Sequence, residues 1–248
     1  MLNVDQSLND IENKIEKEHY NEALNLLQYV LNRNFLSENK LLLLKAFMLK
    51  SKIYFLKGRY FNALDQIKSA LENTLLDEKS LELLDALLIQ EEILWSLGDL
   101  NQSWDVLQQS ENILNSLENK YPNIELSKRL CIIKLHRGVI SAKKGDLLPA
   151  LEFALQGLSL AGEIGTGNLS LIGWAHKDIG YYYYEIGELN PALSHCQKAL
   201  TIWEQTAKIR PLTLILNLIG LIKFQQNNLD KAMKFFHKSF LIFTCNFI

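Results

Sequence analysis

The sequence predicts an all-α protein assembled from about six copies of one helix-turn-helix unit. First, one short segment recurs along the whole chain. Second, apolar residues on both sides of each copy recur at spacings of three and four, which is the helical period. Third, the 248 residues include only 4 prolines and 12 glycines, so residues that break helices are scarce.

The recurring segment is clearest as KGRYFNALDQIKSAL, which starts at Lys57. Each copy has one residue at which the chain is expected to turn, and these residues are Glu18, Gly58, Gly98, Gly145, Gly187 and Asn227. Their successive spacings are 40, 40, 47, 42 and 40 residues. Because glycine and asparagine tolerate positive φ, we expect a tight turn between two helices at each copy.

Two further positions repeat with the turn. Two residues after it comes a large apolar side chain, namely Tyr20, Tyr60, Leu100, Leu147, Leu189 and Leu229. Five residues after it comes a small one, namely Ala23, Ala63, Ser103, Ala150, Ala192 and Ala232. A small side chain on the apolar face lets the two helix backbones of a unit approach closely. Pro149 and Pro191 fall in the first turn of a second helix, where the missing N–H costs nothing.

These signals predict a single repeat domain over residues 1–248. Its units are expected at residues 5–33, 39–74, 78–118, 124–163, 168–207 and 211–244. The first helices are expected at residues 5–17, 39–57, 78–97, 124–144, 168–186 and 211–226. The second helices are expected at residues 20–33, 60–74, 100–118, 147–163, 189–207 and 229–244. The long spacing before Gly145 predicts an extended loop over residues 115–126, around Pro122.

The pattern resembles the tetratricopeptide repeat (TPR) family. In the fifth unit Gly180, Tyr183, Gly187, Ala192 and Ala199 follow the family's order of small, aromatic, turn glycine, small and small. The resemblance implies a right-handed superhelical α-solenoid whose first helices line a concave groove. Most units have 40–42 residues rather than the usual 34, which looks like the long variant of cytosolic adaptors and some bacterial regulators.

The chain departs from the family pattern in several places. His176 stands where a tryptophan is usual, and Cys196 where a bulky aromatic is usual. Seven residues before the turn a small residue is typical, but the third unit has Glu91 there, and Ser103 replaces alanine opposite it. We therefore expect the third unit to pack irregularly.

The resemblance places a partner-binding groove on residues ten, six and three positions before each turn. The candidate groove residues are Lys52, Phe55, Trp95, Lys177, Tyr181, Tyr184, Asn217 and Phe224. Mainly structural roles are expected for Phe55, Trp95 and Phe224, because large aromatics contribute most by burial. Lys177, Tyr181 and Asn217 are stronger candidates, with an ordinary solvated face as the alternative. The stripe is rather apolar and mixed in charge, which favours an apolar or amphipathic helical ligand over an acidic C-terminus.

Four consecutive tyrosines, residues 181–184, lie in the fifth first helix. Tyr183 is expected in the core, against the second helix of its unit. Tyr182 points about 100° away and is expected either to pack against a neighbouring unit or to stay half exposed. Tyr181 and Tyr184 are three residues apart and are expected to line the groove.

No motif indicates chemistry, so we expect no catalytic residue, metal site or cofactor, and no enzyme. The five histidines form no metal-binding spacing, and neither His-Glu-x-x-His nor Cys-x-x-Cys occurs. The adjacent His195 and Cys196 point apart on a helix and cannot form a simple nucleophile–base pair. The segment GEIGTG, residues 162–167, follows a helix and lacks Gly-Lys-Ser/Thr, so it indicates a linker rather than a phosphate loop.

Charge and hydropathy restrict the partner class. A net charge of −2 predicts no nucleic-acid partner. The basic run at residues 127–145 is interpreted as a solvated face beside acidic neighbours, with a basic patch for an acidic partner or RNA as the alternative. The apolar stretch at residues 41–49 is shorter than the ~20 residues of a membrane span, so no membrane association is expected. Three cysteines and no secretory signal favour a cytoplasmic location.

The predicted function is a protein–protein interaction scaffold that binds a peptide or helical segment of a partner. A ligand- or peptide-sensing regulatory module of a larger system is the alternative. The last predicted helix is apolar, with Met233, Phe236, Phe240, Leu241 and Phe243, where a solenoid normally ends in a polar capping helix. Self-association, docking of another protein and a truncated longer array are the three explanations left open.

Overall fold

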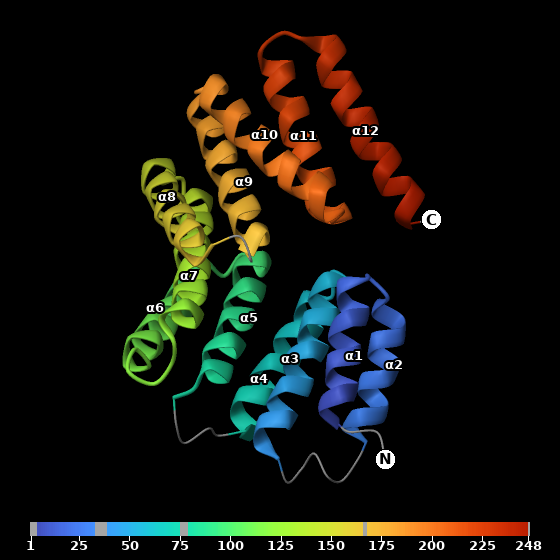
Figure 1. Cartoon of the computed structure of the whole chain (residues 1–248), viewed down its shortest axis with the longest axis vertical. Helices are drawn as coiled ribbons and strands as arrows, with labels where there is room; N and C mark the ends of the chain where they lie inside the picture. The colour runs from blue at the N-terminus through green and yellow to red at the C-terminus, as the bar shows by residue number, and fades with distance from the viewer. Residues whose placement is uncertain (1–3, 33–38, 75–78, 166–167, 248) are drawn as a thin grey trace. The chain divides into compact units, whose positions relative to one another are not determined.

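The chain is entirely α-helical wherever the computed structural model describes it, namely over residues 4–32, 39–74, 79–165 and 168–247 (Figure 1). Twelve helices and no strand lie in those residues, which confirms the predicted fold class. They divide between two compact units, Met1–Tyr121 and Pro122–Ile248. The division falls inside the connection that follows the third hairpin, and the expectation of a single domain stays a prediction.

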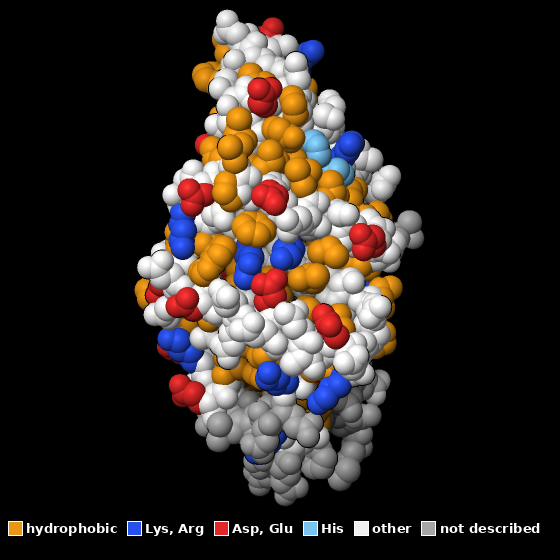
Figure 2. Space-filling view, turned by 90° about the vertical axis from the view of Figure 1, so that its left-hand side faces the viewer, with side chains coloured by type: hydrophobic (Ala, Val, Ile, Leu, Met, Phe, Trp, Pro, Cys, Tyr) orange, Lys and Arg blue, Asp and Glu red, His pale blue; other side chains and the backbone are white. Residues whose placement is uncertain are grey.

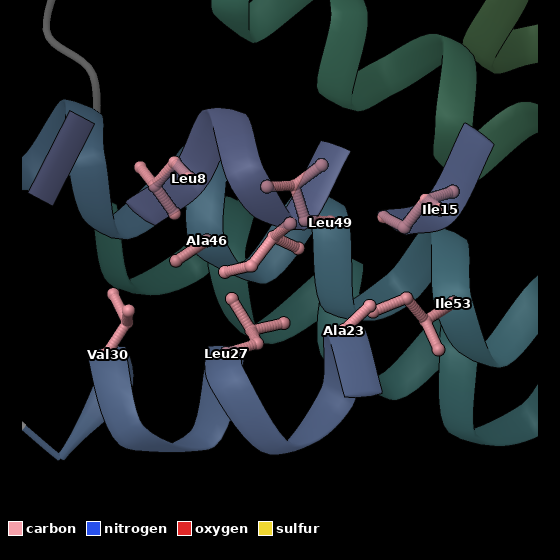
Figure 3. Close-up of a cluster of buried hydrophobic side chains, with 9 residues drawn as sticks. Leu8, Ile15, Ala23, Leu27, Val30, Ala46, Leu49 and Ile53 are labelled. Carbon is pink, nitrogen blue, oxygen red and sulfur yellow. The ribbon is translucent and has the colours of Figure 1, made fainter. Parts of the chain in front are cut away.

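The first unit contains three helical hairpins. Its helices are α1 (Val4–Glu16), α2 (Tyr20–Leu31), α3 (Lys40–Leu56), α4 (Tyr60–Thr74), α5 (Leu81–Leu97) and α6 (Leu100–Ser116). Each hairpin packs on the next, so that α3 contacts α1 and α2 on one side and α5 on the other. Figure 3 shows one result, in which side chains from α1, α2 and α3 meet in a single apolar cluster that includes Leu8, Leu27 and Leu49.

The second unit contains the other three hairpins. Its helices are α7 (Asn123–Lys143), α8 (Leu147–Ile164), α9 (Leu169–Ile186), α10 (Leu189–Thr206), α11 (Ile209–Gln225) and α12 (Leu229–Phe247). Here too the hairpins stack in chain order, with α9 in contact with both α7 and α11. One apolar cluster joins α7, α8 and α9, and another joins α9, α10 and α11.

The predicted helix bounds are close to the observed ones. All six second helices begin at the predicted residue, and the largest error at a first helix is the start of α5, predicted at 78 and found at Leu81. The extended loop predicted over residues 115–126 was wrong in extent. Helix α6 continues to Ser116. Helix α7 starts at Asn123, directly after Pro122, whose backbone is extended (φ −59°, ψ 139°).

The six turn residues all adopt positive φ, as predicted. The angles are 61° at Glu18, 72° at Gly58, 89° at Gly98, 92° at Gly145, 96° at Gly187 and 59° at Asn227. In the fifth unit Gly187 N–H donates to the Tyr184 carbonyl at 3.0 Å, and Glu188 N–H donates to the Tyr183 carbonyl at 2.9 Å. The same two bonds close the other five turns. This pairing satisfies the last carbonyls of each first helix.

The small residues lie where the two helices of a hairpin approach most closely. The small residue that lies five positions after each turn is buried in all six hairpins. These residues are Ala23, Ala63, Ser103, Ala150, Ala192 and Ala232. In the fifth hairpin this small residue, Ala192, faces Gly180 of α9. A β-carbon at position 180 would lie 2.6 Å from Cys196 Sγ and 3.2 Å from the Ala192 carbonyl oxygen. The close approach of the two backbones therefore requires glycine here.

The third hairpin accommodates Glu91 by pairing it. Its side chain is fully buried at the place where the other units have a small residue. Ser103, on the facing helix, donates a hydrogen bond from Oγ to Glu91 Oε1 at 2.7 Å. The two departures from the repeat pattern therefore compensate one another, since a buried carboxylate needs hydrogen-bond partners.

Helix α8 is the one helix in the described part of the chain that is long and apolar enough to cross a membrane. Buried helices of soluble proteins pass the same test of length and composition. In this structure α8 packs between α7 and α9, and its Ala150, Ala154 and Ala161 are fully buried there. Packing against α7 and α9 in the second unit therefore accounts for the apolar composition of α8.

Candidate functional site

The predicted groove residues fall into two sets, one in each unit. Lys52 and Phe55 lie on α3 and Trp95 lies on α5, and these two helices contact each other in the first unit. In the second unit, α9 carries Lys177, Tyr181 and Tyr184, while α11 carries Asn217 and Phe224. Helices α9 and α11 are also in contact.

The first set is mostly half-buried. Phe55 is half-buried, packs on the cluster that contains Ala63 and Ile67, and lies 5.4 Å from the ring of Tyr60, centroid to centroid. The mainly structural role expected for Phe55 stays a prediction, which this packing supports. Trp95 is half-buried as well, which leaves Lys52 as the exposed side chain of the set.

Lys177 is a positioned cation. Its Nζ lies 2.5 Å from Asp178 Oδ1 and 5.3 Å from the centroid of the Trp174 ring. Trp174 packs against the cluster formed with α10 and α11, and the Asp178 side chain is buried. An ammonium that is held by a carboxylate and an aromatic face loses less conformational freedom when it binds a partner.

The four tyrosines separate by environment. Tyr182 is 1% exposed and belongs to the cluster formed with α7 and α8, so it packs against the preceding hairpin, one of the two placements expected. Tyr183 is half-buried between this cluster and the next one, rather than fully in the core. Tyr184 is half-buried against α10 and α11. Tyr181 is 40% exposed and is the tyrosine that a ligand reaches most readily.

The hydroxyl of Tyr181 is kept in its neutral form. Partial burial raises the pKa of Tyr181, and the carboxylate of Glu185, one turn further along α9, raises it further. The ring packs edge to face against Tyr182, with centroids 5.8 Å apart. Tyr181 therefore presents an oriented apolar ring with a phenol that can both donate and accept hydrogen bonds.

On α11 the two predicted residues are both accessible. Asn217 is exposed, and Phe224 is 59% exposed. Phe224 is thus less buried than the mainly structural role expected for it would suggest. Its equivalent one repeat earlier, Tyr184, is covered by α11, whereas no helix in the described part of the chain packs over Phe224.

The charge of the basic run is partly neutralised within its own helix. In α7, Lys128 Nζ lies 2.9 Å from Glu125 Oε1, and Arg129 Nη1 lies 3.1 Å from Glu125 Oε2. The pKa of Glu125 is lowered by its hydrogen bonds with these two residues. Figure 2 shows acidic, basic and apolar side chains mingled over the face that it draws. The basic run therefore has acidic partners within its own helix, and the expectation of no nucleic-acid partner stays a prediction.

A histidine pair escaped the sequence analysis. His176 of α9 and His195 of α10 approach to 3.0 Å between their Nδ1 atoms. Burial lowers the pKa of His176 to about 4, and His195 and Lys198 add to the effect. The two residues stand eleven before and eight after Gly187, so comparison of facing positions across one hairpin could have found them. No group of three or more metal-ligating side chains occurs in the part of the chain that the structure describes.

Solved structures share this fold at low sequence identity. BtubC (BKLC) from P. vanneervenii matches 99% of this chain and 92% of its own, with a TM-score of 0.62 and 10% identity. A Rap protein complexed with Competence and Sporulation Factor matches over 96% and 76%, with a TM-score of 0.72 and 16% identity. A STAND protein with a tetratricopeptide repeat sensor, PH0952 from Pyrococcus horikoshii, matches over 99% and 36%, with a TM-score of 0.69 and 15% identity.

Comparison of the sequence with models of protein families identifies the family of this chain. A search of curated proteins by sequence finds no match. The family model of the MalT-like TPR region matches residues 78–243, which is most of the chain and includes four of the six hairpins. This match agrees with the repeated turn, the paired small residues and the stacked hairpins. The chain therefore belongs to the MalT-like TPR region family.

Proposed function

We propose that the chain is a non-catalytic interaction module that binds a peptide or helical segment of a partner protein. The binding surface is the one that α9 and α11 share in the second unit. Lys177, Tyr181 and Asn217 make the polar contacts, and Tyr184 and Phe224 supply apolar area. Repeat proteins of this type are interaction or sensor modules, which supports the general class.

The observation that carries the proposal is the organisation of Lys177 and Tyr181. Both are accessible, yet both are held by neighbours, Lys177 by Asp178 and Trp174 and Tyr181 by Tyr182. Positioned polar groups beside exposed aromatic area are what interfaces use for affinity and orientation. The Rap neighbour, which shares the fold, was solved with Competence and Sporulation Factor bound, which supports a peptide or protein ligand.

An amphipathic helical segment is the ligand class that fits this surface. The five residues offer one ammonium, one amide, two phenols and one phenyl ring. An apolar stripe of the ligand would pack on Phe224 and Tyr181, and a carboxylate or carbonyl would accept hydrogen bonds from Lys177 and Asn217.

Affinity capture with the full chain tests the proposal. Wild type and the Lys177→Ala/Tyr181→Ala/Asn217→Ala variant are used as baits, and recovered proteins are quantified by mass spectrometry. The expected result is that at least one partner is recovered at least tenfold less with the variant. Because Lys177→Ala removes the ion-pair partner of the buried Asp178, circular dichroism and a thermal melt check that the variant remains folded.

A matched control replaces three exposed residues on α10, as Asn190→Ala/Ser194→Ala/Gln197→Ala. This control should recover every partner as the wild type does. If the α9 and α11 variant recovers all partners equally well, the groove assignment is wrong.

A sensing module is the second candidate, and the STAND neighbour, a protein with a tetratricopeptide repeat sensor, favours it. This chain spans 36% of that protein, so any output domain would be an addition to what is seen here. A thermal-shift screen against peptides and metabolites separates the two. Stabilisation by a small metabolite would favour sensing, and stabilisation by peptides alone would favour the scaffold.

A further inference from the structure

Two histidines from different helices meet in the fifth hairpin. His176 of α9 and His195 of α10 have their Nδ1 atoms 3.0 Å apart and their ring centroids 5.0 Å apart. The ring of Tyr183 packs beside His195, with centroids 5.9 Å apart. The two helices are themselves held close where Gly180 meets Ala192, so the fold, rather than a loop, sets the distance between the imidazoles.

A hydrogen bond is the simplest account of this contact. It requires one Nδ1 to carry a proton and the other to accept it, so the two imidazoles would adopt opposite tautomers. In the alternative account both Nδ1 atoms are unprotonated, and their lone pairs point at a shared cation. Burial lowers the pKa of both His176 and His195, and neutral imidazole is the form that ligates metals. Only the second account predicts a bound ion.

The distance suits two ligands of one transition-metal ion. Imidazole nitrogens lie about 2.0–2.1 Å from Zn²⁺, and tetrahedral coordination places two of them roughly 3.3–3.4 Å apart. The observed 3.0 Å is within roughly 0.4 Å of this separation, a difference that small rotations of the two side chains remove. His195 is half-buried, so water can reach the remaining positions of the ion.

The neighbouring cysteine is not a third ligand. A carbon added at Gly180 would lie 2.6 Å from Cys196 Sγ, so the sulfur packs against α9 one turn away from His176. Burial raises the pKa of the Cys196 thiol to about 12 and keeps it protonated, whereas the thiolate is the form that binds metal. No group of three or more metal-ligating side chains lies in the described residues, so water completes the coordination.

We propose that His176 and His195 form a two-histidine site for a late first-row divalent cation, Zn²⁺, which cross-links α9 and α10. Imidazole is a favoured ligand of these ions. The expectation of no metal site was based on linear spacing, and this pair escapes such a search because its members are 19 residues apart (195 − 176) on opposite sides of a turn. With two protein ligands instead of the usual four, we expect a Kd on the order of 10 µM.

Isothermal titration calorimetry with Zn²⁺ and the untagged full chain tests the proposal. The metal-free protein should bind one equivalent with a Kd of about 10 µM at neutral pH. His176→Gln and His195→Gln should each weaken binding at least tenfold. His195 is half-buried, so its variant should remain folded, which circular dichroism checks. His237→Gln removes an exposed histidine of α12 and should bind Zn²⁺ as the wild type does.

Lys198 offers a second test, one that adventitious binding would not pass. Its charge lowers the pKa of both His176 and His195, so it must also repel a cation bound between them. Lys198→Gln should therefore tighten Zn²⁺ binding, by roughly threefold for an exposed ammonium. Lys231→Gln removes the same charge from an exposed position on α12 and should leave the Kd unchanged.

Spectroscopy and thermal melts report on the ligands and on the cross-link. Cu²⁺ binds nitrogen sites more tightly than Zn²⁺, and its electron paramagnetic resonance spectrum should show two nitrogen ligands in the wild type. His195→Gln should lose this signature. Zn²⁺ should raise the Tm of the wild type but not that of His195→Gln, because the ion binds the folded hairpin.

Three results would overturn the proposal. Zn²⁺ binding that His176→Gln and His195→Gln both leave unchanged would be adventitious. Absence of saturable binding below about 1 mM Zn²⁺ would leave the contact as a hydrogen bond only. An equal effect of Lys198→Gln and Lys231→Gln on the Kd would place the ion elsewhere. The site shares no ligand with the proposed groove, so each proposal can fail without the other.

Discussion

Replacement of Gly180 by alanine tests the close helix approach in the fifth hairpin. A methyl group at this position would lie 2.6 Å from Cys196 Sγ and 3.2 Å from the Ala192 carbonyl oxygen. Both neighbours are buried, and the second is backbone, so α9 and α10 must separate. Overpacking costs roughly 1–3 kcal/mol, while alanine gains ~1 kcal/mol of helix propensity over glycine. The net expectation is a loss of up to about 2 kcal/mol in the free energy of unfolding.

The assay is urea unfolding followed by circular dichroism, with thermal melts as a second measure. For a chain of this size, 1 kcal/mol corresponds to a Tm change of roughly 2–4 °C. Gly162→Ala is the matched control, because Gly162 also lies in a helix but has no atom within 4 Å of the added carbon. This control should gain up to ~1 kcal/mol.

Partial rescue would identify the contact. In Gly180→Ala/Cys196→Ala the sulfur is gone, so the loss should be smaller than the sum of the two single losses by about 1 kcal/mol. If Gly180→Ala stabilises the protein as Gly162→Ala does, the hairpin tolerates a wider separation and the packing argument for the small residues is wrong.

Three further predictions address other features of the fold. Ser103→Ala should lower the free energy of unfolding by about 1–3 kcal/mol, because it removes a hydrogen bond from buried Glu91. Glu91→Gly/Ser103→Ala should recover most of this loss. If the losses of the two single mutants simply add in the double mutant, the pairing is contradicted. Since the pKa of His176 is depressed from 6.5 to about 4, the unfolded chain takes up a proton first, so stability should fall as pH falls from about 6.5 to about 4. His176→Gln should flatten this slope in urea titrations at several pH values, whereas His237→Gln, at an exposed position, should not. Glu18→Gly should raise Tm, since a non-glycine residue at φ 61° costs on the order of 1 kcal/mol; an unchanged Tm would mean that the turn is not strained.

The turns and helix starts were predictable because they depend on local chemistry. Positive φ is a property of one residue, and the bonds that close a turn span six residues, so Gly187 and its neighbours contain the whole signal. The same holds for the buried small residues such as Ala192, which face a partner in their own hairpin. Even Asn227, which is not glycine, was recognisable by its place in the repeat.

The remaining features depend on contacts between hairpins. Spacing within α9 placed Tyr183 in the core, but Tyr182 is the more buried because it packs against α7 and α8, and that contact follows from stacking. Phe224 has the periodicity of a structural aromatic and is exposed because no described helix covers it. The His176–His195 contact needed facing positions to be compared across a turn, a comparison that a search for linear motifs omits.

The six closed turns also bear on how the chain folds. Each hairpin joins helices that are adjacent in sequence, and its first tertiary contact, between residues such as Gly180 and Ala192, spans only a dozen positions. Short loops close at low entropic cost, and chains dominated by local contacts fold quickly. Each hairpin can therefore begin to form from contacts within itself, and it is stabilised when the next hairpin stacks on it. Errors in one hairpin would then stay confined to its nearest neighbours, as in a one-dimensional chain of coupled units.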